Sequence, residues 1–332
     1  MFLILHIKRG NMLSKKAIKL RKRYSKFASI LSFLAYDSDY PSNYKNKIQR
    51  INYDLITGLQ PKAKNAKKEI LDLDGINTWK VTVPNSDPNK IILYFHGGAY
   101  IVGSPKGYYS LGSRIAEATG STVYIPDYRL APEYYFPAQL EDGVKIYKAL
   151  LNQEGYSPDQ IAIGGDSAGG NLTLITILKL KELGIDMPKA SFCISPWADP
   201  PATGETYNED MADLDILMGP VMKKNWTQYK HDGFAGYYVK NKDLDPNNPY
   251  IAPIHGDFSG CPPIMIQVGS HECLLSDARS LKDAYENSGC EVEYREWEGM
   301  WHVFHFEAKL PETIESLKLF GEFLNKYMNV NV

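Results

Sequence analysis

Ser167 stands at the centre of a glycine-rich stretch whose flanks change character. Residues 161–170 read Ile-Ala-Ile-Gly-Gly-Asp-Ser-Ala-Gly-Gly, which contains the pattern Gly-x-Ser-x-Gly. By itself this short pattern is also compatible with an ordinary glycine-rich turn. Here an apolar run before it predicts a strand and the stretch after it predicts a helix, so the serine falls on a tight strand-to-helix turn. Such a turn strains the backbone and requires small neighbours, which makes the Ser167 hydroxyl a candidate nucleophile.

The stretch of residues 96–100, His-Gly-Gly-Ala-Tyr, supplies candidate donors for the charge that such a nucleophile creates. Attack on a carbonyl places negative charge on its oxygen, and each N–H group aimed at that charge is worth ~10²–10³ in rate. Gly97 and Gly98 have no side chains in the way, so we predict their N–H groups as donors, with the N–H of Ala168 as a further one. His96 is predicted to hydrogen-bond this loop, and the alternative for the whole loop is a plain turn.

Two later loops carry the ionisable groups that a serine nucleophile needs. A hydroxyl attacks well only when a base removes its proton, and a third group orients that base. His302 lies on the loop after the last predicted strand, whereas His305 is expected to begin the next helix. The acid is expected after the previous strand, where Glu272 and Asp277 are both available. Glu272 directly follows the strand end, whereas Asp277 begins a helix and has an N-cap as its competing role.

Short apolar runs alternate with amphipathic stretches over most of the chain. Strands are predicted at residues 69–74, 78–83, 91–95, 122–125, 161–163, 190–195, 263–268 and 291–296. Helices are predicted at residues 110–119, 138–151, 171–183, 277–287 and 311–328. Residues 75–77 should join the first two strands as a hairpin. Strands that alternate with helices form a mainly parallel sheet covered on both faces, so an α/β fold is predicted.

Two segments lack this alternation. Residues 1–65 are basic and read as an N-terminal helical segment, and residues 199–260 form an aromatic insertion with helix character at 217–230. We predict that both segments contribute to a cap, and that residues 66–332 form the catalytic domain with the insertion inside it. Aromatic residues in such a cap more often pack than contact a ligand. The side chains predicted to line a substrate pocket are Tyr100, Trp226 and Phe234.

Several motifs resemble those of a known family, in the same order along the chain. They are HGGAY at residues 96–100, DYRLAPE at 127–133, FPA at 136–138, GDSAGG at 165–170, YIAP at 250–253 and PPIMIQVG at 262–269. Their combination is similar to that of the hormone-sensitive-lipase-like esterases, of the bacterial acetyl-esterase or carboxylesterase type. The resemblance runs from about residue 91 to the C-terminus, and residues 1–65 carry little of it.

This resemblance implies an α/β-hydrolase fold, with a mainly parallel sheet, helices on both faces and a helical cap. It also implies the chain order nucleophile, acid and base, which Ser167, Glu272 and His302 satisfy, and it places the acid at Glu272. One departure is Ala99, where many members have a third glycine. A methyl group should be tolerable there, because the predicted donors belong to the two glycines before it.

The composition is that of a large globular protein and excludes some classes of function. The chain has 332 residues, of which 44% are hydrophobic and 23% charged, enough to bury a sizeable core. A formal net charge of −2 gives no basic excess, so no nucleic-acid partner is expected. The four cysteines form no Cys-x-x-Cys pair, which suggests neither a zinc site nor a disulfide framework.

The N-terminus resembles a secretory signal but departs from it. A basic stretch at residues 8–26 precedes an apolar run at 27–35. Serines interrupt that run, no small-x-small cleavage site is clear, and the run is too short to span a bilayer. We expect an amphipathic helix packed on the body, no stable membrane insertion and a cytoplasmic location. Met12 is an alternative start to Met1.

These residues predict a two-step acyl transfer. Ser167 attacks the carbonyl of a small-molecule ester with a short acyl chain, His302 takes the proton, and Glu272 stabilises the imidazolium. This chemistry requires no cofactor and no metal. Two alternatives stay open: a catalytically inert ligand-binding relative, and an amidase or peptidase with the same triad. The family resemblance also makes a homodimer an expectation.

Overall fold

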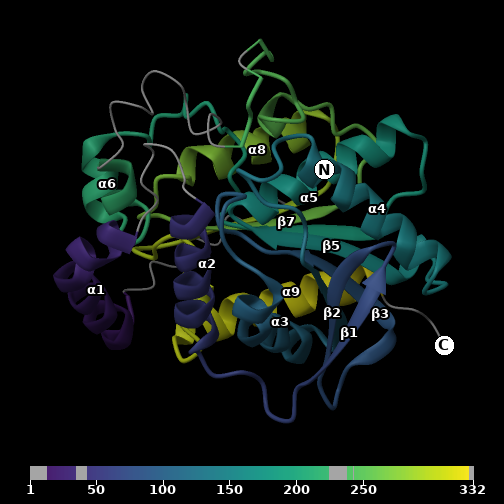
Figure 1. Cartoon of the computed structure of the whole chain (residues 1–332), viewed down its shortest axis with the longest axis horizontal. Helices are drawn as coiled ribbons and strands as arrows, with labels where there is room; N and C mark the ends of the chain where they lie inside the picture. The colour runs from purple at the N-terminus through teal and green to yellow at the C-terminus, as the bar shows by residue number, and fades with distance from the viewer. Residues whose placement is uncertain (1–12, 35–42, 224–237, 242, 329–332) are drawn as a thin grey trace, which may run out of the picture.

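The computed structural model describes residues 13–34, 43–223, 238–241 and 243–328, and an eight-stranded sheet runs through this part (Figure 1). Its strands are β1 (Lys67–Leu73), β2 (Ile76–Thr82), β3 (Asp87–Phe95), β4 (Ser121–Pro126), β5 (Ile161–Asp166), β6 (Ala190–Ile194), β7 (Ile264–Gly269) and β8 (Val292–Trp297). The order across the sheet is β1-β2-β4-β3-β5-β6-β7-β8. β2 pairs antiparallel with β1 and with β4, and every later pair is parallel. The predicted mainly parallel sheet is confirmed.

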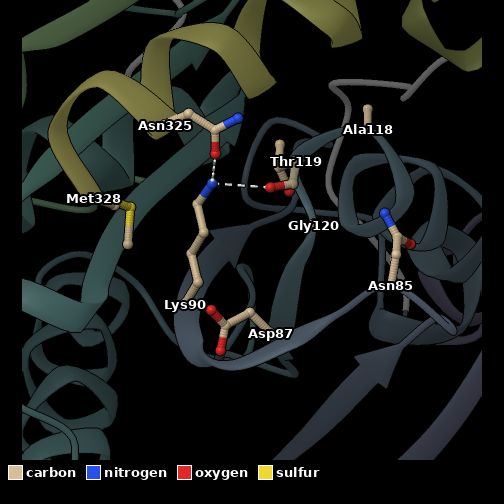
Figure 2. A pocket seen from close by; sticks show the side chains of 8 residues that line it. All are labelled: Asn85, Asp87, Lys90, Ala118, Thr119, Gly120, Asn325 and Met328. Atoms are coloured by element: carbon tan, nitrogen blue, oxygen red, sulfur yellow. Dashed lines mark hydrogen bonds between the residues drawn. The ribbon is translucent and has the colours of Figure 1, made fainter. Parts of the chain in front are cut away.

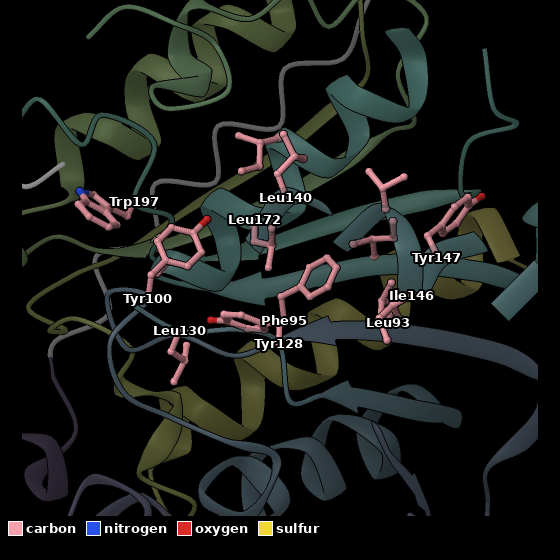
Figure 3. Packing of buried hydrophobic residues seen from close by; sticks show 14 of the residues in the cluster. Leu93, Phe95, Tyr100, Tyr128, Leu130, Leu140, Ile146, Tyr147, Leu172 and Trp197 are labelled. Carbon is pink, nitrogen blue, oxygen red and sulfur yellow. The ribbon is translucent and has the colours of Figure 1, made fainter. Parts of the chain in front are cut away.

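Helices cover both faces of this sheet. One face carries α3 (Pro105–Thr119) and α9 (Pro311–Met328), and the other carries α4 (Ala138–Asn152), α5 (Ala168–Glu182) and α8 (Leu275–Asn287) (Figure 1). Successive side chains of a strand point to opposite faces. Along β3, Ile92 and Tyr94 pack in the cluster with α3 and α9, while Leu93 and Phe95 pack with α4 and α5 (Figure 3). Because β3 is buried on both sides, it reads as a continuous apolar run.

The predicted hairpin is present, with a tighter turn than expected. β1 and β2 are joined by Asp74 and Gly75 alone, whereas the sequence suggested residues 75–77. Both turn residues have positive φ, 53° and 81°, as a two-residue hairpin turn of this kind requires. Glycine adopts such angles without steric cost, and aspartate is one of the few other residues that tolerates them.

Some element boundaries differ from the prediction because local polar groups set them. α3 begins at Pro105 rather than Ser110. Ser104 accepts a hydrogen bond from the Gly107 N–H, and proline suits the first position of a helix. β5 continues past its apolar start to Asp166, so the strand ends directly before Ser167.

Two helices precede the sheet, inside the segment predicted to be helical. α1 (Lys15–Leu34) and α2 (Asn43–Gly58) lie to one side of the sheet, with α1 near α6 (Glu209–Leu214) of the insertion (Figure 1). α2 packs on α3, whereas α1 packs on the segment after β8. Of the helix predicted at 217–230, residues 219–223 are helical and the remainder lies outside the described residues. No helix in the described part of the chain is long and apolar enough to cross a membrane.

Candidate active site

Ser167 occupies the sharp turn between β5 and α5. β5 ends at Asp166 and α5 begins at Ala168, so the serine alone separates strand from helix. Its backbone has φ 53° and ψ −119°, a strained combination for a residue with a side chain. A Cβ at Gly165 would lie 2.4 Å from the carbonyl oxygen of Gly169, so the turn closes only around a glycine. The predicted strand-to-helix turn is confirmed.

The N–H groups around this turn differ in what they already bind. The N–H of Gly97 donates to Asp166 Oδ1 at 3.1 Å, so it is not free to meet a developing charge. Among the described residues, the N–H groups of Gly98, Ala99 and Ala168 have no acceptor. The prediction for Gly97 is therefore corrected: Ala99 takes its place as a candidate donor beside Gly98 and Ala168.

Asp166 fixes the loop that carries two of these donors. Its carboxylate accepts hydrogen bonds from Tyr94 at 2.7 Å and from Tyr108 at 2.9 Å, besides the Gly97 N–H. Burial raises its pKa to about 6, although these donors favour the charged form. A Cβ at Gly97 would lie 2.4 Å from Asp166 Oδ2, which explains the glycine there. In the sequence, the only signal for this role is the position of Asp166 next to the serine, and the role was not predicted.

His96 stays a structural residue, as predicted. Its Nδ1 lies 2.8 Å from the carbonyl oxygen of Gly97, and its ring stacks on Tyr128 with centroids 4.3 Å apart. The ring is fully buried, and burial lowers its pKa to about 4. A neutral, packed imidazole of this kind holds the loop in shape.

Ser195, directly after β6, joins the three segments that carry the candidate triad. The neighbouring Ile194 carbonyl accepts the Ser167 N–H at 2.9 Å. The Ser195 hydroxyl donates to Glu272 Oε2 at 2.9 Å and accepts the N–H of Val303 at 3.1 Å. The sequence analysis placed Ser195 at a strand end but gave it no role. Because β6 lies between β5 and β7 in the sheet, its carboxyl end is the natural meeting point of these loops.

Glu272 and His302 form a buried pair. Their Oε2 and Nδ1 atoms are 3.8 Å apart, farther than a hydrogen bond, and the two residues are 0% and 6% exposed. Among the described residues, Glu272 Oε1 and His302 Nδ1 have no hydrogen-bond partner. Burial raises the pKa of Glu272, and His302 opposes that rise. Burial lowers the pKa of His302, but the carboxylates of Glu272, Asp215 and Asp166 together raise it by more, so a proton on the imidazole is stabilised.

Asp277 supports the segment after β6 rather than the start of α8. α8 begins at Leu275, so Asp277 lies inside its first turn. Its Oδ2 accepts the N–H groups of Ala198 at 2.9 Å and Asp199 at 2.8 Å, and the hydroxyl of Tyr207 at 3.1 Å. The expected N-cap role is therefore wrong. Burial raises the pKa of Asp277 well above its usual value, and the nearby Asp199 carboxylate adds to this rise.

An aromatic wall stands beside the nucleophile turn. The N–H of Trp197 donates to the carbonyl oxygen of Ser167 at 3.0 Å, and its ring lies 6.3 Å from that of Tyr100 (Figure 3). The ring centroids of Tyr238 and Tyr100 are 4.6 Å apart. The Tyr100 hydroxyl donates to Asn171 Oδ1 at 2.8 Å. Tyr100 is thus fully buried in packing. Of the other side chains predicted to line a pocket, Trp226 and Phe234 lie outside the described residues.

A pocket near the start of β3 contains Lys90, whose role is structural. Lys90 lies near the start of this strand, whereas the loop of residues 96–100 follows its end (Figure 2). The Lys90 ammonium donates to the Thr119 carbonyl oxygen at 2.9 Å and to the Asn325 side chain, so it caps the C-terminal end of α3. Burial lowers its pKa to about 8. Across the described residues, no three His, Cys, Asp or Glu side chains are placed to hold a metal ion.

Comparisons with known proteins agree with this fold. The family described as "alpha/beta hydrolase fold" matches residues 92–306. An acetyl-hydrolase of Streptomyces hygroscopicus is 37% identical over 242 residues, covering 73% of this chain and 77% of that protein. An esterase of Acinetobacter venetianus is 30% identical over 271 residues, covering 81% and 86%. The crystal structure of an esterase from the bacterial hormone-sensitive lipase family has a TM-score of 0.80 at 33% identity, covering 93% of this chain and 99% of that one.

The chain therefore belongs to the α/β-hydrolase family, among the hormone-sensitive-lipase-like esterases. It is an enzyme, a serine carboxylesterase of this kind.

Proposed function

We propose that this enzyme hydrolyses carboxylic esters through Ser167, His302 and Glu272 in two acyl-transfer steps. The junction at Ser195 carries the proposal, because it links the nucleophile turn to the loops of the acid and the base. His302 removes the Ser167 proton as the serine oxygen bonds to the ester carbonyl carbon, and that proton then leaves with the alcohol. Water, deprotonated by the same imidazole, then attacks the acyl-serine and releases the acid.

The N–H groups of Gly98, Ala99 and Ala168 hold the charged oxygen in this proposal. Each of them lacks an acceptor among the described residues, and Ala168 also begins α5, whose N-terminal end favours negative charge. Such donors act strongly because they are already in place when the charge develops.

We further propose that the acyl chain is short. The buried rings of Tyr100, Trp197 and Tyr238 pack against one another, in the same cluster as Ala168, which directly follows Ser167. A long acyl chain would have to displace packed side chains, which protein interiors resist. One relative, from Streptomyces hygroscopicus, is named an acetyl-hydrolase, which agrees with a small acyl group.

The binding partner, location and oligomeric state of the enzyme are further proposals. We infer a small-molecule ester as the binding partner, no nucleic acid, no stable membrane insertion, a cytoplasmic location and a homodimer. Size-exclusion chromatography with light scattering tests the homodimer, and a monomer at all concentrations would contradict it.

The substitution Ser167→Ala tests the proposed reaction. It should abolish hydrolysis of p-nitrophenyl butyrate while the circular dichroism spectrum stays unchanged, since only the attacking oxygen is removed. The unsubstituted enzyme should form a covalent adduct with an organophosphonate, and mass spectrometry should locate it on Ser167. A folded enzyme that is not labelled, or a Ser167→Ala variant that keeps its activity, would refute the proposal.

A further inference from the structure

α1 lies against the loops that carry the proposed acid and base. Its residue Ala17 is completely buried, and the ring of Tyr24 meets that of Trp301 edge-on, with centroids 6.1 Å apart. Trp301 directly precedes His302. α1 therefore packs against the loop that carries His302, although no sequence motif connects this helix with catalysis.

Arg21 of α1 contacts three separate segments at this place. Its Nη1 lies 2.6 Å from His271 Nδ1 and donates to the carbonyl oxygen of Gly299, also at 2.6 Å. Its Nη2 donates to the carbonyl oxygen of Leu214, the last residue of α6, at 3.1 Å. His271 directly precedes Glu272, and Gly299 begins the loop that leads to His302. Burial and the Arg21 charge lower the pKa of His271, so its Nδ1 stays available as an acceptor.

The segments that Arg21 contacts are also bonded to one another. The N–H of His271 donates to the Met300 carbonyl oxygen at 2.9 Å, and the N–H of Gly299 donates to Ser270 Oγ at 2.8 Å. Asp215, next to Leu214, accepts the Cys273 N–H at 2.9 Å. A planar guanidinium can satisfy several such acceptors at once and keep their spacing fixed. The acid and base loops thus share the guanidinium of Arg21 as a common hydrogen-bond donor.

The distance between the two loops matters, because Glu272 and His302 are not in hydrogen-bond contact in this structure. Glu272 Oε2 and His302 Nδ1 are 3.8 Å apart, and a strong bond needs about 1 Å less. A shift of about 1 Å in catalytic geometry can cost on the order of a hundredfold in rate. A residue that sets the distance between these two loops therefore controls whether the pair closes when substrate is bound.

We infer that Arg21 is a positioning residue for ester hydrolysis, which holds the loops of Glu272 and His302 at the spacing that the reaction needs. This inference rests on the proposed triad. It differs from a purely structural role, because other residues already attach α1 to the start of α9 and to the residue pair just before it, away from His271 and Gly299. The N–H and the hydroxyl of Ser14 donate to the Glu312 carboxylate at 2.8 and 3.0 Å. The Lys16 ammonium donates to the Lys309 carbonyl oxygen at 2.8 Å.

The test compares Arg21→Ala with Lys16→Ala, a matched loss of one cation from the same helix. With p-nitrophenyl butyrate, Arg21→Ala should lower kcat by about tenfold to a hundredfold and change KM by less than about threefold, because the substrate site is left intact. Lys16→Ala should keep kcat within about twofold. Equal kcat values in the two variants, whatever their melting temperatures, would overturn the inference.

Two further variants keep the outcome clear. Arg21→Lys keeps the charge and most of the stem, but its single nitrogen cannot reach all the acceptors that Nη1 and Nη2 of the guanidinium reach separately, so kcat should fall between the values of the unsubstituted enzyme and Arg21→Ala. If Arg21→Ala does not fold, Arg21→Lys decides, and an unchanged kcat in it rejects the inference. Activity in Ser167→Ala would instead reject the proposed triad, whereas an inactive Ser167→Ala beside a fully active Arg21→Ala rejects only the role of Arg21.

Discussion

At the scale of single residues, the two carboxylates after β7 have separate tasks although they lie on one short segment. Glu272 binds Ser195 and faces His302, whereas Asp277 binds backbone N–H groups of the segment after β6. The sequence shows both carboxylates and their distance along the chain. It does not show their partners, which come from strands far away in the sequence.

Substituting each carboxylate by its amide should separate these tasks. Glu272→Gln should lower kcat on the order of 10⁴-fold with an unchanged melting temperature, as for a triad acid made neutral. Asp277→Asn should retain most of the activity but lower the free energy of unfolding by about 1–3 kcal/mol, because a neutral amide oxygen accepts the N–H groups of Ala198 and Asp199 more weakly than a carboxylate. Steady-state kinetics and thermal unfolding of both variants check this. A stable but inactive Asp277→Asn beside an active Glu272→Gln would show that the acid is wrongly assigned.

The pH dependence of kcat/KM should reflect the interaction between Glu272 and His302. Burial lowers the pKa of His302, but Glu272, with smaller contributions from Asp215 and Asp166, raises it by more, so the net pKa lies above the ordinary value of 6.5. His302 accepts a proton only when neutral, so kcat/KM should fall as the pH drops through this raised pKa. In Glu272→Gln the largest of the raising charges is gone and burial remains, so the acid limb of the residual activity should move to lower pH. A pH profile with p-nitrophenyl butyrate measures this, and an unmoved limb would count against the pairing.

At the scale of elements, the sequence predicted the interior well and the boundaries less well. β3 and β5 were recognisable because strands buried on both faces form unbroken apolar runs. The start of α3 was missed because it depends on the Ser104 side chain, and the last residues of β5 were missed because they are glycines and an aspartate. For the site, a local pattern identified Ser167, whereas the roles of Asp166 and Ser195 depend on contacts between distant segments.

The junction of β3 with the start of α5 should not tolerate a methyl group. A Cβ at Gly169 would lie 1.9 Å from the Phe95 carbonyl oxygen and 2.6 Å from that of His96, both backbone atoms. Gly169→Ala should therefore lower the free energy of unfolding by at least about 1–3 kcal/mol and reduce kcat, because it pushes the loop of residues 96–100 away from Ser167. Chemical denaturation and kinetics test this. Gly58→Ala is the control, since its Cβ would meet nothing closer than 3.7 Å, and equal stability of the two variants would contradict the argument.

At the scale of the whole molecule, the aromatic wall should limit the substrate. We expect acetyl to hexanoyl p-nitrophenyl esters to have the highest kcat/KM and long-chain triglycerides to be poor substrates, because a long chain would have to displace the packed rings of Tyr100, Trp197 and Tyr238. A series of esters with graded acyl length measures this. A higher kcat/KM for the palmitoyl than for the butyryl ester would be incompatible with the wall as a boundary.

The junction at Ser195 also bears on how the chain reaches its active form. Its bonds to Glu272 and to Val303 connect residues 77 and 108 positions apart in the sequence. Contacts of such long range form late, because the chain between them must first lose its freedom. During refolding, helix signals should thus recover before hydrolytic activity does. The recovery of hydrolytic activity would then measure the docking of β7 and β8 onto the rest of the sheet. It would thus distinguish completely folded enzyme from a form that has only its helices.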